Sequence, residues 1–141
     1  MTLITLPGDS WEIGKVHGSL LKEPIHAFIT QLHHACKPVA QIEETLEKYR
    51  QIIQHQLPDI YTEILGLAEG AAISIQEAIL LQVRREIVGV RRYTLTGDCT
   101  TIGFLSGDDS TIAQTIDLEG GIRDYGYAFK IQQENKPTLL Q

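Results

Sequence analysis

The spacing of hydrophobic residues changes once along this chain, close to residue 95, and this change constrains the fold more than any other feature of the sequence. Before it, hydrophobic residues recur every three or four positions, as in amphipathic helices; after it, they alternate with polar residues, as in strands. A length of 141 residues suffices for one domain with a hydrophobic core. We therefore expect an α+β protein with a helical segment over residues 1–98 and its first β-strands over residues 99–141, in one structural domain.

Local signals predict four helical segments before the change, and the first has a recognisable start. It begins at Asp9 or Ser10, because Asp9 and Glu12 have the spacing of a capping box. Proline lacks a backbone N–H and disturbs a helix interior, so Pro24 is expected to interrupt or restart this segment.

The other three helices are predicted from the spacing of hydrophobic residues and from residues that begin or end helices. Hydrophobic residues at helical spacing predict a long second helix: Val39, Ile42, Leu46, Tyr49, Ile53 and Leu57. Pro58 ends it and begins a third helix, which ends near Gly70. Ser74 and Glu77 have the spacing of a second capping box, which precedes the fourth helix over residues 75–88.

Alternating hydrophobic and polar residues predict three strands in the last third of the chain. Residues 99–105 and 111–118, joined by the short polar turn 106–110, have the pattern of a hairpin. After Gly120-Gly121, alternation over residues 125–133 predicts a third strand. Three strands make an incomplete sheet, so its edges and one hydrophobic face need cover from other polypeptide.

Composition excludes several classes of partner and location. The net charge is −6 and only 12 residues are Lys or Arg, so nucleic acid and anionic lipid are not expected as main partners. The chain has no stretch of about 18 apolar residues and no signal-peptide pattern, which predicts a cytoplasmic protein outside the membrane. Cys36 and Cys99 are interpreted as free thiols, although a disulfide between them stays open.

The predicted hairpin joins a candidate nucleophile to a carboxylate. Cys99 stands at its start, and Asp117 follows 18 residues later, near the end of the second strand. The hairpin brings both ends back to the same side, so Cys99 and Asp117 are expected to lie close together. A cysteine with a carboxylate nearby indicates acyl-transfer chemistry.

Three stretches of the chain resemble a known family when they are taken in order. They are Trp11-Glu-Ile-Gly-Lys-Val-His-Gly18, Leu57-Pro-Asp-Ile-Tyr-Thr-Glu-Ile-Leu-Gly-Leu-Ala-Glu-Gly70, and Asp98-Cys-Thr-Thr101 with Gln114-Thr-Ile-Asp117. This set resembles the penicillin acyltransferase family, the acyl-coenzyme A:6-aminopenicillanic acid acyltransferase-like branch (peptidase C45) of the N-terminal nucleophile hydrolases. The matching stretches extend across essentially the whole chain.

The resemblance implies a fold, a processing step and a set of site residues. The fold is the four-layer αββα sandwich, of which this chain would hold the N-terminal part. The precursor cuts itself between Asp98 and Cys99, and Cys99 becomes both the first residue and the catalyst. Asp117 orients the new amino group and the substrate, and Thr100 and Gln114 help to position the substrate.

This sequence differs from the family pattern in two ways that affect the site residues implied by the resemblance. The family commonly has glycine directly before the nucleophile, whereas here Asp98 holds that place and Gly97 lies one residue earlier. The later strands of the family, and its later asparagine and arginine site residues, have no counterpart in this sequence. We therefore expect the chain alone to lack a complete site, and expect a C-terminal partner chain or a homo-oligomer to complete it.

Self-cleavage would solve a problem of protonation. The thiolate is the attacking form of cysteine, but a free thiol with a pKa of about 8.5 is mostly protonated at neutral pH. Cutting before Cys99 gives that residue an α-amino group that can take the proton from its own thiol. The predicted activity is that of a cysteine amidohydrolase or acyltransferase that acts on small amides or acyl thioesters, with no cofactor and no metal.

Plainer interpretations stand beside this one. Cys99 could be an inert buried thiol in a non-catalytic module that binds a partner through its open sheet edge. Asp117 could cap a turn before Gly120-Gly121. Gly14 and Gly18 fit close helix packing better than ligand binding.

A metal site could be drawn from four residues that lie close in sequence: His26, His33, His34 and Cys36. His33 and Cys36 are three apart, so a helix would place them on one face. We favour solvated histidines, because no second group of ligands with matching spacing occurs in the sequence.

Overall fold

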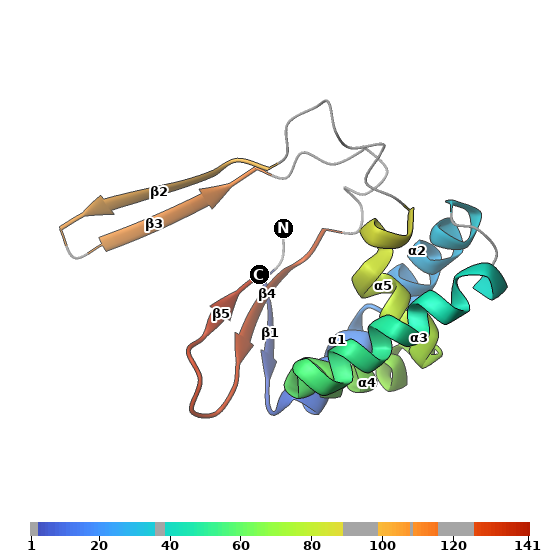
Figure 1. The fold of residues 1–141 in the computed structure, drawn as a ribbon. Coiled ribbons are helices and arrows are strands. Elements are labelled where there is room, and N and C mark those ends of the chain that lie inside the picture. Colours follow the sequence, from blue (N-terminus) through green and yellow to red (C-terminus); the bar gives the residue numbers. More distant parts are fainter. Residues whose placement is uncertain (1–2, 36–38, 89–98, 108, 116–125) are drawn as a thin grey trace. The chain divides into compact units, whose positions relative to one another are not determined.

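The structure is a computed structural model and describes residues 3–35, 39–88, 99–107, 109–115 and 126–141. The chain forms two compact units, residues 1–89 with 127–141 and residues 90–126. The helices and a small sheet belong to the first unit, and a β-hairpin belongs to the second. Helices and strands in the described parts confirm the expected α+β class (Figure 1).

The part of the chain that the structure describes holds five helices: α1 Ser10–Leu20, α2 Lys22–Ala35, α3 Val39–Gln56, α4 Pro58–Ala71 and α5 Ile75–Val88. Four helical segments were predicted, and the first is interrupted and restarted close to Pro24, as expected, so five helices result. The break falls at Leu21, whose φ of −111° and ψ of 25° are not helical. Pro24 lies in the first turn of α2, where the missing backbone N–H breaks no helical hydrogen bond.

Both predicted capping boxes are confirmed. The backbone N–H of Glu12 donates to Asp9 Oδ1 at 2.9 Å, and the backbone N–H of Asp9 donates to Glu12 Oε2 at 3.0 Å. Before α5, the backbone N–H of Ser74 donates to Glu77 Oε2 at 2.8 Å, and that of Glu77 donates to Ser74 Oγ at 3.2 Å. Each box satisfies N–H groups that the first turn of a helix leaves without a partner.

The first unit contains a three-stranded sheet whose first strand was not predicted. β1 (Leu3–Pro7) pairs in parallel with β4 (Ala128–Gln132), and β4 pairs antiparallel with β5 (Leu139–Leu140). Figure 1 shows β1 in blue beside β4 in red, although the two strands come from opposite ends of the chain. β1 was missed because a five-residue strand far from its partner carries little local signal.

The second unit contains the predicted hairpin. β2 (Thr101–Ser106) and β3 (Asp109–Gln114) are antiparallel, with a register that runs from Thr101 opposite Gln114 to Ser106 opposite Asp109. Gly107 turns the chain with a φ of +62°, a conformation that glycine adopts without strain. The three predicted strands were expected in one sheet, which is wrong: β4 pairs with β1 and β5, and β2 pairs with β3.

Two hydrophobic clusters hold the first unit together. The larger one joins α2, α3, α4 and α5 and includes the fully buried residues Leu46, Ile79 and Leu80. The smaller one joins α1 to the sheet and consists of Leu6, Ile13, Leu21, Phe129 and Ile131. In the described parts of the chain, every fully buried side chain is apolar. The smaller cluster therefore fixes β1 and β4 to α1.

Helices α1 and α4 approach each other closely through glycines. An added Cβ on Gly14 would overlap the carbonyl oxygen of Glu63, and one on Gly66 would overlap that of Trp11. Gly18 and Gly70 have the same relation to the opposite helix. Contact between a glycine and a backbone requires the absence of a side chain, so the interpretation of Gly14 and Gly18 as packing residues is confirmed.

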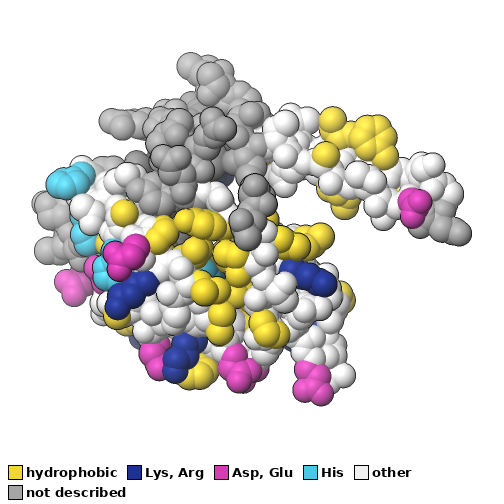
Figure 2. Space-filling model, turned by 180° about the vertical axis from the view of Figure 1, so that it is seen from behind, with side chains coloured by type: hydrophobic (Ala, Val, Ile, Leu, Met, Phe, Trp, Pro, Cys, Tyr) yellow, Lys and Arg dark blue, Asp and Glu magenta, His cyan; other side chains and the backbone are white. Residues whose placement is uncertain are grey.

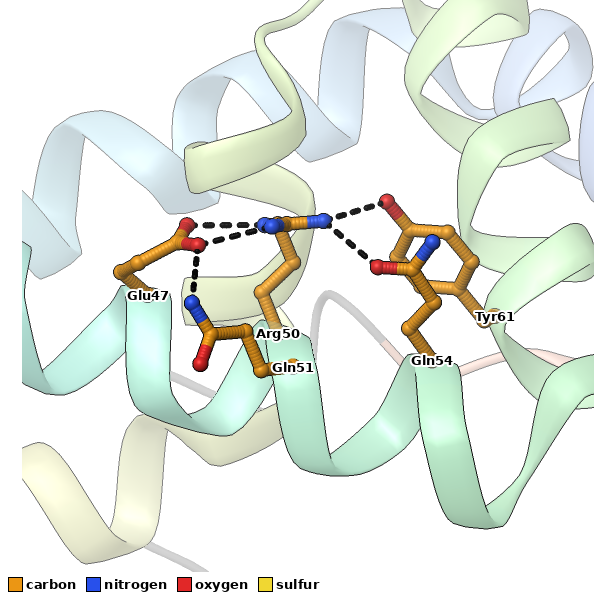
Figure 3. A network of polar contacts seen from close by, with 5 residues as sticks. All are labelled: Glu47, Arg50, Gln51, Gln54 and Tyr61. Atoms are coloured by element: carbon orange, nitrogen blue, oxygen red, sulfur yellow. Dashed lines mark hydrogen bonds and ion pairs between the residues drawn. The ribbon is translucent and has the colours of Figure 1, made fainter.

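A polar network joins α3 to α4 (Figure 3). Figure 3 shows Arg50 between Glu47 on one side and Gln54 and Tyr61 on the other. Two guanidinium nitrogens donate to the Glu47 carboxylate at 2.7 and 2.8 Å, and a third donates to Tyr61 Oη at 3.1 Å. Hydrogen bonds from Arg50 and Gln51 lower the pKa of Glu47 to about 2.

Within the described residues, no single helix is long and apolar enough to cross a membrane. The pair of helices α4 and α5, which bend by 119° at their junction, meets that test of length and composition only when the two are taken together.

Candidate functional site

Cys99 lies two residues before β2 and is half-buried. Its thiol is free, and Cys99 is the one cysteine that lies within the described residues. Cys36, Asp98 and Asp117 lie outside the described residues, so the structure does not place the proposed cleavage bond or the carboxylate. The candidate site can therefore be built from Cys99 and from the part of the hairpin next to it.

One residue pair joins the two strands beside Cys99. The backbone N–H of Thr115 donates to the carbonyl oxygen of Thr100 at 2.9 Å. In return, the backbone N–H of Thr100 donates to the side-chain hydroxyl of Thr115 at 3.0 Å. These bonds bring the residue after Cys99 next to a residue that precedes Asp117 by two positions in the sequence. Thr115 was not singled out from the sequence, since a threonine in a strand gives no chemical signal.

The two residues that the resemblance suggests for substrate positioning lie at this end of the hairpin. Thr100 is bonded to Thr115, and Gln114 lies directly opposite Thr101. The side chains of Thr100, Thr101 and Gln114 are exposed. Residues directly opposite in an antiparallel pair have their side chains on the same face, so Thr101 and Gln114 share one face of the hairpin.

The hairpin has hydrophobic side chains on both faces. Ile102 and Phe104 lie on one face, and Leu105 and Ile112 lie on the other, because side chains alternate along a strand. Their exposed fractions range from 49% for Ile102 to 88% for Leu105. Figure 2 shows hydrophobic side chains standing out from the hairpin at the upper right. Strands with two apolar faces are typical of sheets that are covered on both sides.

The histidines considered as metal ligands either make a hydrogen bond within the protein or are exposed. The Nε2 of His26 is 2.8 Å from the carbonyl oxygen of Ala71, so Nε2 carries the proton and donates to the C-terminal end of α4. His33 and His34 are exposed, and Cys36 lies outside the described residues. No group of three or more His, Cys, Asp or Glu residues in the described ranges is arranged to hold a metal ion.

His17 fixes α1 to the sheet. Its ring lies 4.6 Å from the ring of Phe129 in β4, measured between centroids, with an angle of 48° between the ring planes. Burial lowers the pKa of His17, because the charged imidazolium loses hydration in this position. Although His17 belongs to the first of the three family-like stretches, this contact gives it a packing role.

A shallow depression of about 360 Å³ lies where β1 meets α1 and is lined by Pro7, Gly8, Trp11, Glu12, Lys15 and Val16. The ammonium group of Lys15 lies 4.4 Å from the centre of the Trp11 ring and 2.9 Å from the Glu69 carboxylate. Glu12 is engaged in the capping box with Asp9. Both charged groups that line the depression are thus held by neighbouring residues of the protein.

Comparison with known proteins confirms the resemblance to acyltransferases of the penicillin type. The chain is 29% identical, over 144 aligned residues, to the acyl-coenzyme A:6-aminopenicillanic-acid-acyltransferase 40 kDa form of Emericella nidulans. The alignment covers 99% of this chain and 40% of the relative, so the chain spans less than half the length of that protein. No family model matches the chain.

Proposed function

We propose that this chain carries the nucleophile of a cysteine N-terminal nucleophile acyltransferase or amidohydrolase. The observation that supports it most is the likeness to an acyltransferase over 99% of the chain, which includes the stretch around Cys99. The substrates of this chemistry are small amides or acyl thioesters. The comparison does not favour the alternative of a non-catalytic module that binds a partner through an open sheet edge.

Self-cleavage is the first step of the proposed mechanism. The thiol of Cys99 attacks the carbonyl carbon of Asp98, so that a C–S bond forms, the C–N bond breaks and the released nitrogen takes up the thiol proton. Water then opens the resulting thioester, which frees the thiol and leaves Asp98 with a carboxylate. The product has Cys99 as its first residue with a free α-amino group.

The second step transfers an acyl group. The α-amino group of Cys99 accepts the thiol proton, and the thiolate attacks the carbonyl carbon of the substrate. The leaving amine or thiol departs with that proton, and an acyl-cysteine thioester remains. Water or an amine then takes the acyl group and restores the thiol. Asp117 is proposed to hold the α-amino group in position, and the mechanism uses no cofactor.

Further polypeptide is proposed to cover the hairpin in the working protein. The hydrophobic side chains on both of its faces support this, since central strands of an αββα sandwich are covered on both sides. The cover would come from a partner chain, from a second copy or from additional sequence. The relative, of which this chain spans 40%, is long enough to hold such a part.

Intact mass after incubation tests the proposal, with Cys99→Ala as the inactive variant and Cys36→Ala as the matched cysteine control. We expect the 15.7 kDa chain to be cut between Asp98 and Cys99 in the wild type and in Cys36→Ala, because self-cleavage uses the thiol and the peptide bond of this chain, whereas acyl transfer also needs the covering polypeptide. Cys99→Ala should stay whole, because it has no thiol to attack the carbonyl of Asp98. A cut at the same bond in Cys99→Ala, or acyl transfer by that variant, would refute Cys99 as the nucleophile.

A further inference from the structure

We propose that Thr115 is a positioning residue for Cys99, an inference that rests on the function proposed above. Thr115 holds both backbone polar groups of the residue that follows Cys99. Its hydroxyl accepts the N–H of Thr100 at 3.0 Å, and its own N–H donates to the carbonyl oxygen of Thr100 at 2.9 Å. Thr115, the residue that directly follows β3, therefore orients the two peptide units on either side of Thr100.

The hydroxyl of Thr115 takes the place of a backbone carbonyl group in the hydrogen-bond ladder between the two strands. In an antiparallel pair that exchanges both hydrogen bonds, the N–H of one residue donates to the backbone carbonyl of the other. Here the N–H of Thr100 donates to a hydroxyl instead. The identity of residue 115 thus matters, because a side chain without a hydroxyl cannot make this bond.

This bond acts on the nucleophile through the peptide that joins Cys99 to Thr100. The N–H of Thr100 belongs to that peptide, so the bond to Thr115 fixes its plane together with the carbonyl group of Cys99. After self-cleavage Cys99 is a chain terminus, and termini are poorly ordered unless they are tied down. Thr100 is then the sole covalent neighbour of Cys99, which makes its orientation decisive for where the thiol points.

Thr115 also lies close in the sequence to Asp117, the carboxylate of the proposed site. Asp117 follows Thr115 by two positions in the sequence. Anchoring Thr115 to Thr100 therefore ties the residue next to Cys99 to the residue that precedes Asp117 by two positions in the sequence. Thr115 has no part in the bond changes, and its contribution is the geometry of the attack.

The test compares Thr115→Val, which keeps the shape and removes the hydroxyl, with Thr115→Ser, which keeps the hydroxyl. Thr111→Val is the matched control, because Thr111 is an exposed threonine of β3, opposite Phe104. We expect Thr115→Val to cut itself about fivefold more slowly than wild type, the effect of losing one hydrogen bond of about 1 kcal/mol. Thr115→Ser and Thr111→Val should cut at close to the wild-type rate.

Two readouts that do not depend on cleavage accompany the rates. Exchange of the Thr100 amide hydrogen, followed by NMR, should become faster only in Thr115→Val. The pH dependence of Cys99 alkylation, measured in a Cys36→Ala background, should shift in Thr115→Val and return in Thr115→Ser. Wild-type cleavage, exchange and alkylation in Thr115→Val would overturn the inference. If no form of the chain cuts itself, the proposed function fails, and unchanged exchange and alkylation in Thr115→Val then refute the role of Thr115 as well.

Discussion

At the scale of single residues, His17 shows how burial couples a side chain to the pH of the solution. Its ring packs at an angle against Phe129 between α1 and β4, and burial lowers its pKa from the ordinary value of 6.5. Folding therefore favours the neutral imidazole. The resulting contribution to stability is fully present above pH 6.5 and is lost as the pH falls from there through the lowered pKa.

Replacing His17 by Phe should remove this dependence, because a phenyl ring can pack against Phe129 without taking up a proton. We expect the urea midpoint of the wild type to fall between pH 7.5 and pH 5.5, and that of His17→Phe to fall less. His34→Phe is the control, since His34 is exposed. Equal losses of stability in wild type and His17→Phe over this range would contradict the assignment.

At the scale of secondary-structure elements, the closest contact is between α1 and α4. These helices run in the same direction, because Gly14 lies against Glu63 while Gly18 lies against Leu67, one turn further along both helices. Backbones that approach this closely gain dispersion contacts and weak Cα–H···O bonds. The glycines in two of the family-like stretches, Gly14 with Gly18 and Gly66 with Gly70, therefore serve one packing contact.

Substituting Gly14 by Ala should force the two helices apart. The added Cβ would overlap the carbonyl oxygen of Glu63, which is backbone and cannot turn aside as a flexible side chain can. We expect a loss of about 1–3 kcal/mol in the free energy of unfolding, measured by urea titration followed by circular dichroism. Val16→Ala on the exposed side of α1 should change it little. A Gly14→Ala protein as stable as wild type would show that the helices can separate at no cost.

At the scale of the whole molecule, the first unit is closed by strands from the two ends of the sequence. β1 is hydrogen-bonded to β4 over five paired positions, and Leu6, Phe129 and Ile131 share one hydrophobic cluster. Residues 1–98 and residues 99–141 thus meet in one sheet, although the proposed cut separates them. The turn between β4 and β5 adds an ion pair of 2.8 Å between Lys136 and Asp59 in α4.

We expect the two fragments to stay together after a cut between Asp98 and Cys99, made by the protein itself or at an introduced protease site. Gel filtration under native conditions should elute residues 1–98 and 99–141 in one peak, since cutting the chain leaves the β1–β4 pairing and its cluster intact. Leu6→Asp should separate them, because Leu6 is fully buried. Leu3→Asp, which changes an exposed position of the same strand, should not. Separate peaks for the cut wild type would disprove this cohesion.

The candidate site was predictable from the sequence only in part, for a physical reason. A hairpin with a short turn is encoded by neighbouring residues, so Gly107 and the alternation around it sufficed to predict β2 and β3. The role of Thr115 was not predictable in this way. It depends on the register of the two strands, which places its hydroxyl against the Thr100 N–H across 15 residues of chain.

The sequence by itself determined those features that depend on residues within a few positions of each other, such as the starts of helices. Two helices are capped by hydrogen bonds between residues three positions apart, Asp9 with Glu12 and Ser74 with Glu77. These local signals predicted the helix starts correctly. The tertiary structure alone decided that β4 pairs with β1, whose Leu3 lies 125 positions before its partner Ala128. Such a pairing closes a long loop, and its stability comes from burial of Leu6 and Phe129 against α1, which no local pattern encodes.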